Sequence, residues 1–172
     1  MRGCLKSALW ASGALAGYHR LRNRNVLTVA AFHRVLDPAD PRSAGADPLW
    51  TVSPAFFAHC LDFFAEHYRV VSLADVLAAR EGMRPLPLWP LLITFDDGWA
   101  DNHDYALPEL RRRGLPAALF VATGAIGRHE GFWQERVLSA FKTGRIAPSL
   151  AAELWRRLVP DRHEANLLDE VW

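Results

Sequence analysis

The sequence has few cysteines, little net charge and no long apolar run, and each shortage excludes a class of protein. Its 2 cysteines are too few for the disulfide framework that stabilises many small secreted proteins. Its formal net charge is only +1, so no overall field attracts nucleic acid or another polyanion. No stretch approaches the roughly 20 consecutive apolar residues of a membrane-spanning helix. We therefore expect neither a nucleic-acid partner nor a membrane span.

The sequence does contain enough apolar material for one folded domain. Apolar residues make up 51% of the chain and charged residues 23%, which is typical of globular proteins. A chain of 172 residues can also bury a substantial hydrophobic core. We predict a basic N-terminal segment over residues 1–25 and a folded region over residues 26–172.

Residues 1–25 carry five basic side chains and no acidic one, and they allow two interpretations. A basic start, a short apolar stretch and the Ala-Leu-Ala pattern of residues 14–16 are typical of a cleaved signal peptide. Leu5, Leu9 and Trp10 would equally form the apolar face of an amphipathic helix on a membrane surface. A signal peptide implies a cell-envelope or secreted protein. The alternative implies a cytoplasmic protein with a peripheral membrane contact.

Apolar runs of strand length alternate with helical patterns between residues 26 and 122. Ser53 and Ser72 each provide a hydroxyl at a helix start, and proline-rich residues 37–51 indicate a loop. Strands that are apolar on both faces and alternate with helices favour a parallel sheet covered by helices. The predicted strands are 26–32, 68–71, 91–95 and 117–122, and the predicted helices are 54–67, 73–80 and 102–113.

The pattern changes after residue 132, where only helices are indicated. They are separated by Gly144, Pro148 and Pro160, which are residues that end or interrupt helices. The fold class is therefore α/β, with a helical segment over residues 132–172 that follows the fourth strand. The predicted helices of this segment are 135–142, 150–158 and 164–172.

Two neighbouring carboxylates, Asp96 and Asp97, follow the clearest strand of the sequence. Parallel α/β folds place their chemistry at the carboxyl ends of strands, where loops converge over the sheet. Adjacent carboxylates repel each other unless a cation or a shared proton intervenes, and Gly98 allows a tight turn directly after them. One acid could then bind a metal while the other accepts a proton. Alternatively, the pair could simply turn the chain before the next helix.

Four segments, in the same order, resemble the NodB-homology polysaccharide deacetylases. Residues 92–98 (LITFDDG) resemble the first motif of that family, and residues 31–35 (AFHRV) resemble its Tyr-His-x-Val segment. Residues 119–124 and 132–136 extend the similarity forward. The resemblance covers about residues 26–140, which correspond to the N-terminal part of the family's domain.

The resemblance implies a fold and an activity. The fold would be a (β/α) barrel of the NodB-homology type, here partial and truncated, because a full barrel takes roughly 250 residues. The activity would be metal-dependent removal of N-acetyl groups from the amino sugars of a polysaccharide or chitooligosaccharide. The resemblance assigns Asp96 as the general base and Asp97 as a ligand of a divalent metal, most often zinc. A carbohydrate is the implied partner.

The sequence departs from the family where the metal site should be completed. Members carry a His-x-x-x-His pair, and no two of the 7 histidines here are four residues apart. The later Arg-Pro motif and the distal histidine of the family are also missing. Because catalytic zinc usually needs about three protein ligands, we expect little or no activity from this chain alone. A truncated, non-catalytic glycan-binding relative is one alternative, and a magnesium-binding phosphoryl-transfer domain is a more distant one.

Two further residues are candidates for the site. His33 ends the first strand and could reach the same pocket as Asp96, as a residue that supports the site or contacts substrate. Trp133 could stack against a sugar, since aromatic faces suit sugar C–H groups. Each has an equally reasonable structural role, His33 as a hydrogen-bonded strand terminus and Trp133 as a packing residue.

Overall fold

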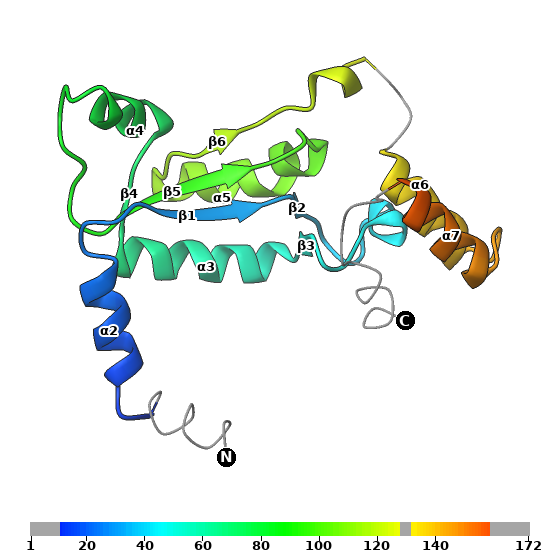
Figure 1. Cartoon of the computed structure of the whole chain (residues 1–172), viewed down its shortest axis with the longest axis horizontal. Helices are drawn as coiled ribbons and strands as arrows, with labels where there is room; N and C mark the ends of the chain where they lie inside the picture. The colour runs from blue at the N-terminus through cyan, green and yellow to red at the C-terminus, as the bar shows by residue number, and fades with distance from the viewer. Residues whose placement is uncertain (1–10, 128–131, 159–172) are drawn as a thin grey trace.

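A computed structural model describes residues 11–127 and 132–158, and a small parallel sheet forms its centre (Figure 1). Strand β5 (Pro90–Phe95) pairs along one edge with β1 (Thr28–Phe32). Its other edge pairs with β4 (Arg69–Val70) near the start and with β6 (Ala118–Leu119) near the end. All these pairings are parallel, which confirms the predicted α/β class. The predicted strand 117–122 is wrong in extent, because only two of its residues pair with β5.

Two helices begin where the sequence predicts them. The Ser53 hydroxyl accepts a hydrogen bond from the N–H of Phe56 at 3.2 Å and begins α3 (Pro54–His67). Ser72 and Asp75 form a reciprocal capping box at the start of α4 (Leu73–Arg80). Both caps satisfy backbone N–H groups that have no partner within the helix. The predicted ranges 54–67 and 73–80 are confirmed.

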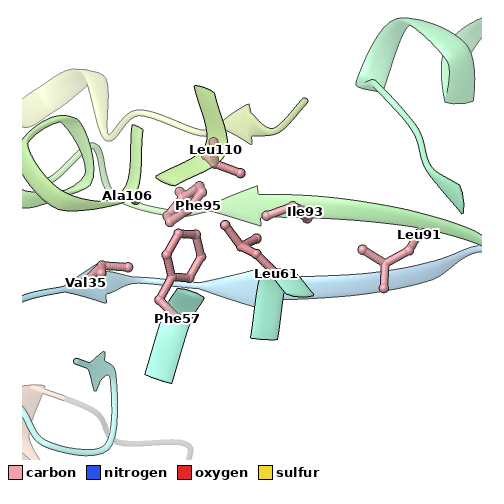
Figure 2. Close-up of a cluster of buried hydrophobic side chains, with 8 residues drawn as sticks. All are labelled: Val35, Phe57, Leu61, Leu91, Ile93, Phe95, Ala106 and Leu110. Carbon is pink, nitrogen blue, oxygen red and sulfur yellow. The ribbon is translucent and has the colours of Figure 1, made fainter. Parts of the chain in front are cut away.

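The hydrophobic core lies between β5 and the helices that pack on it. Because side chains alternate along a strand, every second residue of β5 points to the same face of the sheet. Figure 2 shows these side chains beside residues of α3 and of α5 (Leu107–Arg113). Each fully buried large apolar side chain contributes about 1.5–3 kcal/mol to folding. The buried cluster consists of Val35, Phe57, Leu61, Leu91, Ile93, Phe95, Ala106 and Leu110.

The predicted helix 102–113 is interrupted at its start. Residues Asn102–Ala106 form a π-helical turn, and only Leu107–Arg113 are α-helical. Pro108 explains the difference, because proline has no N–H and its ring clashes with the carbonyl four residues earlier. A wider turn before Pro108 removes this conflict.

The predicted loop 37–51 contains more structure than its composition indicates. Residues Pro41–Gly45 form a 3-10 turn. Strand β3 (Thr51–Val52) pairs in parallel with β2 (Arg34–Val35) in a second, two-stranded sheet. This small sheet follows β1 directly and carries the chain past the end of the main sheet.

Helices occupy both ends of the molecule (Figure 1). At one end, α2 (Ala14–Arg22) includes the residues considered above for signal-peptide cleavage, whereas Leu5, Leu9 and Trp10 lie outside the described residues. At the other end, toward which β1 and β5 point, α6 (Trp133–Lys142) and α7 (Pro148–Leu158) confirm two predicted helices. The third, 164–172, lies outside the described residues. Within the described part, no helix is both long and apolar enough to cross a membrane.

Candidate active site

The acidic pair lies in a tight turn at the end of the central strand. The N–H of Asp96 still donates to the carbonyl of Phe32 at 3.0 Å, so this residue continues the pairing with β1. The chain then reverses, and the N–H of Gly98 donates to the carbonyl of Asp96 at 2.9 Å. Asp97 has φ 71°, in the left-handed region that non-glycine residues seldom occupy. Strained residues of this kind cluster at functional sites, so the conformation of Asp97 points to a role in the site.

The turn is held against the chain that follows β6. A Cβ atom at Gly98, which has φ 81°, would lie 3.0 Å from Cγ1 of Val121, closer than side chains normally approach. The N–H of Ala122 also donates to the carbonyl of Asp97 at 3.3 Å. Only glycine combines this φ with this close approach, and the contact fixes where the two carboxylates emerge.

The two carboxylates have different neighbours. Oδ2 of Asp96 lies 3.9 Å from Nε2 of His33, and both side chains remain partly exposed, at 38% and 29%. The His33 ring lies against Trp50, with 4.6 Å between the ring centroids. Asp97 instead accepts a hydrogen bond from Nε1 of Trp99, at 3.3 Å from its Oδ2. Because their partners differ, the two carboxylates can have different chemical roles.

A buried arginine that the sequence analysis did not single out lies directly behind this turn. Arg34 is 5% exposed, and its Nε donates to Oδ2 of Asp101 at 2.7 Å. A second ion pair joins it to Glu135 of α6. Its guanidinium carbon lies 4.2 Å from the centre of the Trp99 ring. Arg34 thus connects the acidic turn to the helical segment.

The surroundings of Arg34 are acidic and buried. Burial raises the pKa of Asp101 and of Glu135, and Arg34 opposes both shifts. The Oδ1 atoms of Asp101 and Asn102 are buried without a hydrogen-bond partner among the described residues. Asn102 uses its Nδ2 to donate to the carbonyl of His33 at 3.0 Å, which ties His33 to the helix that follows the turn.

The structure places the remaining candidates at different depths. Trp133 is the half-buried first residue of α6, and the ring of its neighbour Phe132 contacts Trp99 at 4.8 Å. His103 is 80% exposed beside Asp104, away from the buried side of its helix. The structure thus places His33 beside Asp96, as the sequence analysis expected, but the sequence did not point to Trp99 and Arg34, which contact each other behind the turn.

The described residues do not complete a metal site. They contain no group of three His, Cys, Asp or Glu side chains placed to hold one ion. Asp97 can offer a single carboxylate, whereas catalytic zinc usually has three protein ligands. In this part of the chain the ligand set therefore does not fit a catalytic zinc, and we derive no chemical step through a metal.

Several known proteins are similar to this chain. Residues 88–166 match the model of the polysaccharide deacetylase family. YxkH of Bacillus subtilis (strain 168), a protein named after the polysaccharide deacetylases, is 38% identical over 47 residues, which are 27% of this chain and 17% of YxkH. The structure of IcaB from Ammonifex degensii is 27% identical with a TM-score of 0.52, and the match covers 68% of this chain and 49% of IcaB.

A further match is a de-N-acetylase from Aggregatibacter actinomycetemcomitans, 26% identical with a TM-score of 0.46 over 54% of this chain and 36% of that one. The chain thus spans at most about half the length of these relatives. The matched segment of the family model contains the whole acidic turn. These findings confirm the resemblance predicted from Asp96, Asp97 and Gly98: this chain is similar, over residues 88–166, to the polysaccharide deacetylase family.

Proposed function

We propose that this chain forms part of a hydrolase site that removes N-acetyl groups from the amino sugars of a polysaccharide or chitooligosaccharide. One observation carries the proposal. Asp96 and Asp97 lie in a strained turn directly after the central strand, within the segment that matches the polysaccharide deacetylase family. A strained backbone conformation persists only where the surrounding structure holds it in place. Here the strained turn gives two neighbouring carboxylates different partners.

Asp96 is the proposed general base. Hydrolysis of an amide requires that a water molecule lose a proton as it attacks the carbonyl carbon. The partly exposed carboxylate of Asp96 can accept that proton, and it lies beside the partly exposed ring of His33. His33 lies at the same position and could contact substrate there.

Asp97 is the proposed ligand of a divalent metal, with zinc the ion that the resemblance implies. If Asp97 and further ligands held such an ion, it would polarise the acetyl carbonyl and lower the pKa of water bound to it. The described residues supply fewer than the three ligands usual for catalytic zinc, as shown above. The missing ligands would have to come from residues outside the described ranges or from another polypeptide. We therefore propose that this chain alone binds metal weakly and is inactive.

A carbohydrate is the proposed substrate class, and the surroundings of His33 suit one. Trp50 is 52% exposed and lies against the His33 ring. An exposed aromatic face next to hydrogen-bonding groups can receive the C–H side of a sugar while its hydroxyls are bonded. Trp50 is thus a better placed candidate for stacking than Trp133. Trp133 is half-buried at the start of α6, next to the contact between Phe132 and Trp99.

Acetate release from N-acetylglucosamine oligomers in the presence of zinc tests this function. We expect none from the 172-residue chain. We expect release only from a longer protein in which further residues supply the missing ligands, and loss of that release in its Asp96→Asn variant. Zinc-dependent turnover by the 172-residue chain would overturn the prediction of inactivity. Glycan binding without acetate release by the longer protein would instead support the non-catalytic alternative.

A further inference from the structure

Arg34 occupies an unusual position for a charged residue. It is 5% exposed and immediately follows His33, yet it points away from solvent toward the helices that follow the acidic turn. A buried charge is costly unless it is paired and hydrogen-bonded. Arg34 meets this requirement with two carboxylates, Asp101 at 2.7 Å and Glu135. The position therefore needs a large cation with several donors.

The contact between Arg34 and Trp99 leads directly to the acidic turn. The guanidinium lies over the indole ring, 4.2 Å from its centre, in the geometry of a cation–π contact. The N–H of the same indole donates to Oδ2 of Asp97. An arginine suits this arrangement because its flat guanidinium can stack on a ring while its edge donates to carboxylates.

The contact with Glu135 brings a distant helix into the same arrangement. Glu135 lies in the first turn of α6, and its side chain is only 19% exposed. Phe132, which directly precedes α6, packs its ring against the Trp99 indole at 4.8 Å. The indole is therefore held from two sides, by the guanidinium of Arg34 and by the start of the helical segment.

We propose that Arg34 is a positioning residue for Asp97. Its guanidinium, anchored by Asp101 and Glu135, holds the Trp99 indole, and the indole N–H sets the orientation of the Asp97 carboxylate. The inference deepens the proposed function, because it explains how one carboxylate of the acidic pair is oriented for a ligand. The interactions themselves do not depend on catalysis and can be measured without it.

Nuclear magnetic resonance of the tryptophan indole N–H groups tests the proposal on the full chain. The Trp99 signal is assigned as the one that disappears in Trp99→Phe. Asp97→Asn removes the charged acceptor and should shift this signal in the wild-type background. In the Arg34→Lys background we expect the Trp99 signal to move and its response to Asp97→Asn to be lost, because lysine cannot stack in the same way.

A matched control is available on the surface. Arg42 also lies near an aromatic ring, 5.9 Å from the centre of Tyr105, and pairs with two carboxylates, Asp40 and Asp104. Arg42→Lys therefore makes the same chemical change in a similar setting elsewhere. It should leave the Trp99 signal and its response to Asp97→Asn unchanged.

The outcomes separate this inference from the proposed function. A folded Arg34→Lys protein in which the Trp99 signal still responds to Asp97→Asn as in wild type would overturn the positioning role. If Arg34→Lys does not fold, Glu135→Gln replaces it, and an unmoved Trp99 signal there would overturn the role equally. If the coupling is present but the longer protein releases no acetate, only the proposed function fails. Acetate release without coupling leaves the proposed function standing and removes this inference.

Discussion

The sheet and the helical segment α6–α7 are held in the protein by different forces. Around β5, apolar side chains from α3 and α5 form a continuous buried cluster (Figure 2). At α6, polar contacts carry much of the attachment: Glu135 pairs with Arg34, and Nζ of Lys142 donates to the carbonyl of Ala46 at 2.9 Å. The buried apolar residues described in α6 and α7 are Leu138 and Ala151.

This difference divides the candidate site into two parts. The acidic turn leaves directly from the apolar sheet, so its position depends on burial, which changes little with pH. The contacts behind the turn depend on Arg34 and its two carboxylates, which respond to pH and to the loss of one partner. We therefore expect changes in the sheet to alter stability most, and changes at α6 to alter the surroundings of Asp97 with less effect on folding.

The largest effect should come from the sheet core. Phe57 is fully buried and packs on Phe32 and Phe95, with ring centroids 5.0 and 5.7 Å away. Phe57→Ala should lower the free energy of unfolding by about 3–5 kcal/mol, measured by urea denaturation. Phe56→Ala is the control, because Phe56 is 55% exposed on the same helix and should cost less than about 0.5 kcal/mol. Equal losses for the two variants would contradict the location of the core.

The junction between the two parts should show the next largest effect. Gly98→Ala introduces a Cβ atom at φ 81° and 3.0 Å from Val121. We expect a loss of about 1–3 kcal/mol in the free energy of unfolding, from backbone strain and the close contact together. Gly114→Ala, at φ 63° with no atom within 4 Å of the added Cβ, isolates the backbone contribution and should cost less. A smaller loss at Gly98 than at Gly114 would show that the turn is not tightly packed.

The α6 contact should show the smallest effect and the clearest pH dependence. Glu135→Gln should change the free energy of unfolding by about 1 kcal/mol at neutral pH, because Arg34 keeps its pair with Asp101. Burial raises the pKa of Glu135 above its ordinary value of 4.5. An acid with a raised pKa in the folded state contributes most below pH 4.5, and its contribution falls as the pH rises through the folded-state pKa.

The unfolding free energy of wild type minus that of Glu135→Gln should therefore decrease as the pH is raised from about 4.5, because only the wild type carries the titrating acid. Acids that interact with neither Glu135 nor Arg34 titrate equally in both proteins and cancel in this difference. One of them is Asp40, whose pKa the neighbouring Arg42 holds well below its usual range. A difference that stays constant between pH 4 and pH 7 would show that Glu135 has no raised pKa.

The parts of the fold that could be predicted from the sequence are those that depend on neighbouring residues. The hydroxyls of Ser53 and Ser72 mark the starts of α3 and α4, because a cap acts on backbone groups two or three residues away. The apolar run of β5 likewise predicts a buried strand. Asp96 and Asp97 follow it directly, so their place at the end of the sheet was also predictable.

The contacts behind the acidic turn could not be predicted in the same way. Arg34 and Glu135 are 101 residues apart, and no local pattern relates them. The orientation of the Trp99 indole depends on that pair and on Phe132, which the sequence alone does not bring together. The pairing of β2 with β3 was missed for the same reason, because two-residue strands carry no periodicity. Tertiary packing determines each of these features.

The most direct test of the account is a zinc titration of the chain followed by nuclear magnetic resonance of the backbone amides. The account predicts that the signals of Asp97 and Gly98 shift with zinc, that the shifts disappear in Asp97→Asn, and that they persist in the surface control Asp104→Asn. Signals of the turn that do not respond to zinc, or that respond equally in Asp97→Asn, would contradict the assignment of Asp97 as a metal ligand and with it the proposed deacetylase site.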